Sequence, residues 1–212
     1  RLEAMSDNWQ FIEGGLSGRR GFTSLAPGTG WAFTTNFAFM LAGSSVVSLG
    51  LDTSQFLPFL DLYHVDTLAL TPVMVSRMIA NPQAAQFLGG IRDIRFGGSV
   101  INETLLRDFA RICPARFYLC YGAAEIGGCL VERWSPDMPR ASGYVGSLTN
   151  PRIEAAFFDE ALNLLPGVTE GIVGFRSTSQ TETRRYLTQA HDSKTGFHHG
   201  FFIPGDVMRR EG

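Results

Sequence analysis

The sequence predicts an α/β fold, in which a mostly parallel layered sheet with flanking helices is followed by a small antiparallel, β-barrel-like subdomain. The first two thirds of the chain alternate short strand segments with helical segments, and those strand segments are almost continuously apolar. Helical periodicity disappears after about Pro139. A chain of 212 residues with 44% hydrophobic residues is long enough for a sizeable core. We therefore expect an α/β subdomain over residues 1–140 and a β-rich, distorted-barrel subdomain over residues 141–212.

The first elements are predicted from length and apolar content. A helix is expected over residues 2–11, and a Gly-rich loop follows it over residues 14–21. Residues 22–26 form a short predicted strand. The segment 31–42 has the length of a helix and is apolar on most faces, which indicates a buried helix, and SVVSL at 45–49 is a predicted buried strand.

The next elements carry local start signals. Apolar residues at helical spacing predict a helix through residues 56–63, where Pro58 must lie near the first turn or kink the helix. Thr71 followed by Pro72 is typical of a helix start, because threonine caps the first turn and proline needs no hydrogen-bond acceptor there. Asn102 caps a further helix whose apolar residues share one face. The remaining elements expected in this part are strands at 67–70, 91–96 and 117–120, and a helix at 73–80.

The last part of the chain reads as short strands. Segments 153–158 and 172–176 are predicted strands on either side of a turn at Pro166-Gly167, and residues 201–203 are a third strand. No helical period is evident there, which favours a small antiparallel sheet or barrel.

Composition excludes several classes of protein. A net charge of −2 and a pI near 6.1 argue against nucleic acid as a partner. The apolar region 33–51 is interrupted by polar residues and glycine, so no membrane span is expected. Three cysteines, Cys113, Cys120 and Cys129, have the spacing of neither a disulfide framework nor a zinc site, and we expect buried free thiols in a cytoplasmic protein.

Two strand ends carry glycines. In parallel sheets ligands bind at the carboxyl ends of the strands, and FGGS (96–99) and YGAAE (121–125) follow two of the predicted strands. Glycines after strands are weak evidence by themselves, because backbone turns need them as well.

The order of five segments is more specific. FGGSVINETLLRDF, YLCYGAAEIGG, GYVGSLTNPRIEAAFFDE, LPGVTEGIVGFRS and GFFIPGDVMRREG follow one another over nearly the whole chain. This order resembles the adenylate-forming superfamily, which comprises acyl-CoA synthetases, luciferases and the adenylation domains of peptide synthetases. The resemblance implies an AMP-forming ligase that uses ATP, Mg²⁺ and coenzyme A.

The resemblance also implies roles for individual residues. Gly97, Gly98 and Ser99 match the turn that lines the adenine, and Tyr121 matches the aromatic residue that stacks on it. Glu125 matches the catalytic carboxylate that binds magnesium. The remaining positions implied to contact the nucleotide are Gly122, Ala123 and Ala124 in the second segment and Asp206, which matches the ribose-binding aspartate. Considered singly, Glu125 also fits a surface carboxylate and Asp206 a turn residue.

The chain departs from the family pattern at two positions and lacks two parts. Ala124 stands where the family has a phosphate-binding threonine, and Pro204 stands where it has the threonine of TGD. The family's phosphate loop and its C-terminal domain, each with a functional lysine, are missing, and the single lysine, Lys194, matches neither. We expect these residues to be an internal fragment of the large N-terminal domain, inactive by itself.

The pocket for the carboxylic acid is predicted from two residues. GTGWAF (28–33) resembles a segment that flanks the acyl pocket of short- and medium-chain acyl-CoA synthetases, although Trp31 fits a core residue equally well. Gly122 occupies the position where acetate-specific members carry a blocking tryptophan. The expected substrate is therefore a carboxylic acid larger than acetate, which suits an enzyme of fatty acid metabolism.

Alternative functions remain open at this point. An adenylation domain that loads a carrier protein fits the same residues, and Ala124 and Pro204 also fit a degenerate nucleotide-binding module without catalysis. Arg19 and Arg20 suit either contact with an anion such as the phosphates of coenzyme A or simple exposure to solvent. The cluster of His191, Asp192, His198 and His199 is expected to be solvent-exposed rather than a metal site.

Overall fold

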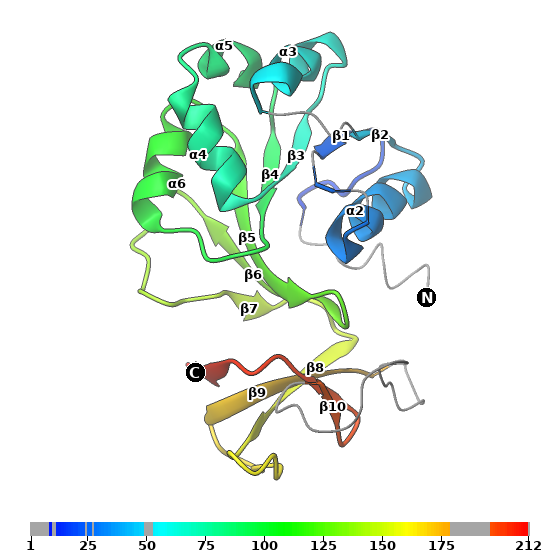
Figure 1. The fold of residues 1–212 in the computed structure, drawn as a ribbon, viewed down its shortest axis with the longest axis vertical. Helices are drawn as coiled ribbons and strands as arrows, with labels where there is room; N and C mark the ends of the chain where they lie inside the picture. Colours follow the sequence, from blue (N-terminus) through cyan, green and yellow to red (C-terminus); the bar gives the residue numbers. More distant parts are fainter. Residues whose placement is uncertain are drawn as a thin grey trace. The chain divides into compact units, whose positions relative to one another are not determined.

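The computed structural model describes residues 9, 12–23, 25–26, 28–48, 53–178 and 196–211. The chain divides into two compact units, Arg1–Thr149 and Asn150–Gly212 (Figure 1). The first contains a mostly parallel sheet with helices and the second an antiparallel sheet, which confirms the predicted fold class. The functional assignment of residues 1–140 and 141–212 to two subdomains stays a prediction.

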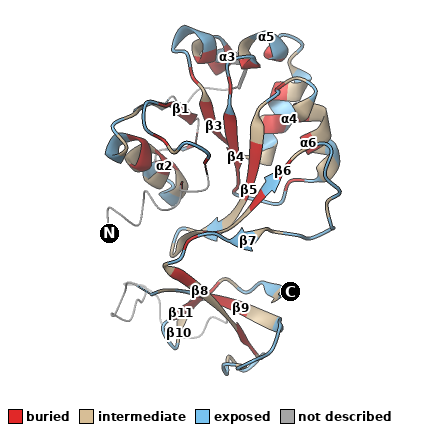
Figure 2. Ribbon diagram, turned by 180° about the vertical axis from the view of Figure 1, so that it is seen from behind, coloured by how far each residue is buried: buried red, intermediate tan, exposed pale blue. Residues whose placement is uncertain are grey.

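The sheet of the first unit has the strand order β2-β1-β3-β4-β5-β6-β7. Neighbouring strands are parallel from β2 through β5, whereas β6 and β7 join antiparallel at one edge. The strands are β1 (Arg20–Thr23), β2 (Ser45–Ser48), β3 (Thr67–Leu70), β4 (Asp93–Phe96), β5 (Arg116–Ala123), β6 (Gly127–Trp134) and β7 (Ser147–Leu148). The central strands β3 and β4 are buried along their whole length (Figure 2).

Helices cover both faces of this sheet, as expected from the apolar strands. The described helices are α2 (Gly30–Leu41), α3 (Thr53–Leu62), α4 (Pro72–Ala80), α5 (Ala84–Leu88) and α6 (Glu103–Ala110). Because side chains alternate along a strand, Leu68 and Leu70 of β3 join the apolar cluster under α3 to α6, whereas Ala69 joins the cluster under α2. The two clusters therefore lie on opposite faces of one sheet.

The capping signals act as predicted. The Thr71 hydroxyl accepts a hydrogen bond from the amide of Met74 at 3.4 Å, with Pro72 as the first residue of α4. The Asn102 side chain accepts from the amide of Leu105 at 2.8 Å at the start of α6. Pro58 lies inside α3, in its second turn rather than its first.

The second unit is an antiparallel sheet in which β8 and β9 form the longest pair. Its strands are β8 (Ile153–Phe158), β9 (Glu170–Ser177), β10 (Gly196–His198), β11 (Phe201–Ile203) and β12 (Val207–Arg209). Four of them run in the order β10-β11-β9-β12, and β8 pairs with β9. Phe158, Phe201 and Ile203 form its small core.

Several predicted elements differ from the structure. The segment 22–26 is a strand two residues earlier, at 20–23, and the strands β6, β7, β10 and β12 and the helix α5 were not predicted. The predicted buried strand at 45–49 is half exposed, because β2 is the edge strand of its sheet. Helix α2 is buried on one face only: Phe33 and Met40 are 52% and 55% exposed.

Other predicted features lie outside the described residues. These are the helix over residues 2–11, apart from Trp9, and the positions Lys194, His191 and Asp192. Of the other two histidines in that predicted cluster, His198 is half-buried in β10 and His199 is exposed in the turn after it.

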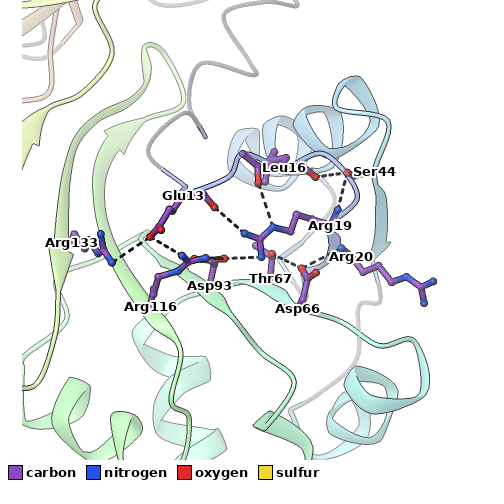
Figure 3. A network of polar contacts seen from close by, with 11 residues as sticks. Glu13, Leu16, Arg19, Arg20, Ser44, Asp66, Thr67, Asp93, Arg116 and Arg133 are labelled. Atoms are coloured by element: carbon purple, nitrogen blue, oxygen red, sulfur yellow. Dashed lines mark hydrogen bonds and ion pairs between the residues drawn. The ribbon is translucent and has the colours of Figure 1, made fainter.

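A charged network lies at the amino ends of the parallel strands, opposite the edge where ligands bind such sheets (Figure 3). Asp93, the first residue of β4, is completely buried and forms an ion pair with Arg19 at 2.9 Å. The Nε and Nη2 atoms of Arg116 donate to the same carboxylate at 2.7 and 2.8 Å. These hydrogen bonds with Asp93 raise the pKa of Arg116. Glu13 accepts from Arg116 at 2.8 Å and joins the Gly-rich loop to the network.

The network corrects the interpretation of Arg19. Its side chain is neither solvated nor directed to an anionic ligand, because it is 5% exposed and paired with Asp93. It also donates to the carbonyl of Glu13 at 3.0 Å, so it anchors the loop that precedes β1. Arg20 instead donates to the carbonyl of Tyr63 at 3.2 Å on the exposed side.

The cysteines are free thiols, as predicted. Burial raises the pKa of Cys113 and of Cys129 to about 12, so both are protonated at neutral pH. Cys120 is only half-buried as a residue. Within the described part of the chain, none of the helices has the length and apolar character needed to cross a membrane.

Candidate functional site

The YGAAE motif forms the end of a hairpin rather than a loop after a strand. Strand β5 continues through Ala123 and pairs with β6, and its register shifts between Tyr121 and Gly122. A Cβ atom on Gly122 would lie 2.2 Å from the carbonyl oxygen of Gly127. The hairpin therefore accepts only glycine at position 122, and it places Glu125 in the connecting turn.

This geometry changes what Gly122 says about the substrate. The absence of a side chain there is explained by the close approach of the two strands, whatever acid is bound. Its role in admitting an acid larger than acetate stays a prediction.

The glycine turn after β4 lies next to the carboxyl ends of β3 and β5. The amide of Gly97 donates to the carbonyl of Leu70 at 3.2 Å, and Gly98 has a φ of +84° that favours glycine. A Cβ atom on Gly97 would lie 3.2 Å from the Trp31 ring and 3.5 Å from the carbonyl oxygen of Cys120. Gly97 is buried, whereas Gly98 and Ser99 are exposed.

Helix α2 begins at the same place. The Thr29 hydroxyl caps the helix by accepting from the amide of Ala32 at 3.2 Å. A Cβ atom on Gly30 would lie 3.0 Å from the Cβ of Ala124, so the first turn of α2 contacts the end of the hairpin. The structure thus brings together three predicted elements: Trp31, the Gly97–Gly98 turn and the turn that carries Ala124.

Arg95 is a buried charge that the sequence interpretation did not single out. It is 5% exposed and precedes the glycine turn by one residue. Its guanidinium lies over the ring of Trp9 at 4.9 Å and near that of Trp31 at 5.9 Å. The sequence signal for a buried arginine was the alternation of charged and apolar residues in DIRF, the sequence of β4. Because Ile94 and Phe96 face one apolar cluster, Asp93 and Arg95 must share the opposite face of the sheet.

Cys120 lies beside Arg95 on that face. Burial raises the pKa of the Cys120 thiol, and the hydrogen bond and charge of Arg95 act in the opposite direction without offsetting it. The residue therefore contributes a neutral thiol, one position before Tyr121, to the surroundings of the site.

Tyr121 and Glu125 are both half-buried, and their roles as ligand-binding residues stay predictions. Asp206 belongs to the second unit, where it lies exposed between β11 and β12, and its carbonyl accepts from the amide of Val173 at 2.9 Å. The glycine before it has a φ of +92°, so the turn explains Gly205. Whether Asp206 contacts a ribose stays a prediction.

The donor set at Glu125 suits magnesium better than a metal held by protein alone. Among the described residues there is no group of three or more His, Cys, Asp or Glu side chains able to hold a metal ion. Magnesium is commonly bound through one or two carboxylates with substrate phosphates and water as the other ligands. One half-buried carboxylate in the hairpin turn is compatible with that mode, and the metal role of Glu125 stays a prediction.

Comparison with known proteins identifies relatives. The model of the AMP-binding enzyme family matches residues 21–186. The inhibitor-bound N-terminal domain of FACL13 from Mycobacterium tuberculosis superposes with a TM-score of 0.81 at 19% identity, covering 98% of this chain and 52% of that one. No curated protein matches the sequence significantly.

Two further solved structures have the same fold. Apo MatB from Rhodopseudomonas palustris superposes with a TM-score of 0.76 at 19% identity, over 98% of this chain and 40% of that one. The O-succinylbenzoate coenzyme A synthetase of Bacillus subtilis, solved with ATP and magnesium, gives 0.72 at 16% identity, over 97% of this chain and 41% of that one. The chain thus spans about half the length, or less, of these structures.

Proposed function

The chain belongs to the AMP-binding enzyme family, and on that premise we propose that the full-length protein activates a carboxylic acid with ATP and transfers the acyl group to coenzyme A. The observation that carries the proposal is the position of the first turn of α2: Trp31 packs against the Gly97–Gly98 turn, and Gly30 packs against Ala124 at the end of the hairpin. Segments far apart in the sequence, each implied to bind nucleotide or acid, meet at the carboxyl edge of the parallel strands.

The proposed reaction has two steps. A carboxylate oxygen of the acid attacks the α-phosphorus of ATP, the bond from that phosphorus to the β-phosphate oxygen breaks, and pyrophosphate leaves. The thiolate of coenzyme A then attacks the acyl carbonyl, and AMP leaves with the former carboxylate oxygen. The first step depends on holding the two reactants in line and on stabilising charge at phosphate oxygens. The second depends on holding the thiolate over the acyl carbonyl and on stabilising the tetrahedral intermediate and the leaving AMP.

The chain's own residues supply the positioning. Tyr121 offers a ring for the adenine to stack on, and the glycine turn lets the backbone approach the base. Glu125 would hold Mg²⁺ together with phosphate oxygens, and the bound ion would neutralise charge on those phosphates. Trp31 places an indole beside the glycine turn, where we propose that the acid, one larger than acetate, binds.

Tyr121→Ala in the full-length protein tests nucleotide binding directly. Loss of a stacking surface worth about 1–3 kcal/mol should raise the Kd for AMP by at least about fivefold. Isothermal titration calorimetry measures this change. Tyr63→Ala is the matched control, because Tyr63 is 44% exposed at the end of α3 and its ring stacks on Phe59. Equal Kd values for both variants and the wild type would refute the role of Tyr121.

A nucleotide-binding module without catalysis is the second candidate, and Ala124 and Pro204 favour it. Neither residue carries a hydroxyl, and proline also lacks a backbone N–H, so three possible hydrogen-bond donors are absent. Such a protein would bind AMP and exchange no pyrophosphate.

Ala124→Thr separates a weakened enzyme from an inactive one. A hydrogen bond to a charged group contributes about 1.5–3 kcal/mol, so the restored hydroxyl should speed ATP–pyrophosphate exchange by about tenfold or more. Position 124 is exposed in the hairpin turn. Ala161→Thr, at an exposed turn of the second unit, is the control. Exchange that stays at background in wild type and variant, with AMP still bound, identifies the module.

A further inference from the structure

Arg140 makes three polar contacts to three different segments. Its Nε donates to the Glu132 carboxylate at 2.9 Å and its Nη2 to the Tyr144 carbonyl at 2.8 Å. Its Nη1 reaches the carbonyl of Ile101 at 3.5 Å. The side chains of Arg140 and Glu132 are only 12% and 9% exposed. Only the planar, five-donor guanidinium can serve three acceptors in this way.

Two of the three acceptors belong to segments that lead into the candidate site. Ile101 is two residues beyond Ser99, and its buried side chain belongs to the apolar cluster under α3 to α6. Glu132 lies in β6 opposite Leu119 of β5, and two positions along the same ladder Leu130 pairs with Tyr121. The guanidinium therefore connects the glycine turn to the hairpin that carries Tyr121 and Glu125.

The third acceptor holds the following turn. Tyr144 precedes Gly146, whose φ is +97° and where a Cβ would lie 2.2 Å from the carbonyl carbon of Val131. Directly after it, Ser147 and Leu148 form β7 on the outer edge of β6. Arg140 thus contacts both β6, through Glu132, and the segment before β7, through Tyr144.

Stability alone does not account for such an arrangement. Replacing a buried ion pair with apolar side chains of similar volume is often neutral or stabilising, because both charges must lose water. A buried pair can instead select one arrangement of the segments that it joins. Here the joined segments lead to Gly97–Ser99 and Tyr121–Glu125, whereas none of these three hydrogen bonds of Arg140 reaches Trp31, which we place beside the acid.

We propose that Arg140 is a positioning residue for the nucleotide: it holds the glycine turn and the β5–β6 hairpin at the separation that an adenine requires. The inference rests on the proposed function and extends it. Because two of the three acceptors of the guanidinium lie in segments that lead to the implied nucleotide contacts, its loss should affect ATP far more than the acid.

Arg140→Met in the full-length protein tests this inference. We expect the KM for ATP and the Kd for AMP to rise about tenfold, while the KM for the acid changes by less than about twofold. Amide hydrogen exchange at residues 97–101 should become faster in the same variant. Arg111→Met is the matched control, because Arg111 makes an exposed pair with Asp108 at 2.6 Å and its side chain is 76% exposed.

Arg140→Lys covers the case in which the methionine variant does not fold. Lysine keeps the charge next to Glu132 but has a single nitrogen, so it cannot bond all three acceptors, and the KM for ATP should stay raised. Wild-type KM values for ATP in this variant, or an equal rise in the KM for ATP and for the acid, would overturn the proposal.

The outcomes also separate this inference from the proposed function. A wild type that fails to bind AMP refutes both. A wild type that binds AMP, with an Arg140→Met variant that is folded and binds it equally well, refutes the positioning role alone. A selective loss for ATP together with faster exchange at residues 97–101 supports it.

Discussion

Asp93→Asn should lower the free energy of unfolding by about 3–5 kcal/mol, the largest effect on stability that we expect from one substitution in this chain. Asp93 is completely buried, forms an ion pair with Arg19 and accepts hydrogen bonds from Arg116. An amide of the same size carries no charge, so the guanidinium of Arg19, 5% exposed, would stay buried without its counterion. The loss is large because the partner cannot return to water without moving the loop that it anchors.

Urea denaturation followed by tryptophan fluorescence measures this change. All three tryptophans lie in the first unit, so their signal reports the part of the chain that contains Asp93. Asp108→Asn is the control: its pair with Arg111 is exposed, and the expected loss is within about 0.5 kcal/mol. A loss at Asp93 as small as that at Asp108 would show that the network does not stabilise the fold.

Glu125→Gln should decrease turnover of the full-length protein by about 100-fold or more, because it removes a charge that stabilises a charged transition state through Mg²⁺. The substitution keeps the size of the side chain in the hairpin turn, so the fold should be unaffected. The Kd for AMP should change little, because the proposed function assigns binding of the base to Tyr121 and the glycine turn. ATP–pyrophosphate exchange across a range of magnesium concentrations measures the effect.

Glu160→Gln, at an exposed turn position of the second unit, is the matched control and should leave exchange unchanged. Turnover in Glu125→Gln equal to that of the wild type would contradict the metal role. A lowered rate that additional magnesium partly restores would support it, because weaker binding of the ion is then the cause.

Local signals predicted much of the first unit. Strand β3 was predicted at its observed bounds, because four apolar or β-branched residues are followed at once by the cap Thr71. Asn102 was predicted as the cap of α6 for the same reason, since a cap depends only on residues three positions apart. The order of the glycine-bearing segments was sufficient to indicate the family that the comparison then confirmed.

The hairpin partner of the candidate site was not predictable in this way. Strand β6 includes Glu132 and Arg133, and such neighbouring charges are atypical of a paired strand. Glu132 is buried only because Arg140 neutralises it, and that pairing depends on how the chain folds back. Tyr121 was therefore predicted at the end of a strand, whereas in the structure it lies within β5 and pairs with Leu130 of β6.

The sequence by itself determined the α/β class, the caps, and the identity of the residues at the carboxyl edge of the sheet, because these depend on alternation and on neighbours a few residues apart. Only the tertiary structure decided which charges are buried. Three arginines look alike in the sequence but have different partners in the fold. Arg19 pairs with Asp93, and Arg95 lies near the rings of Trp9 and Trp31. Arg140 pairs with Glu132 and joins three segments of the chain. The physical reason is that a buried charge is tolerated only where distant residues supply its partners, and those partners are brought together by the fold.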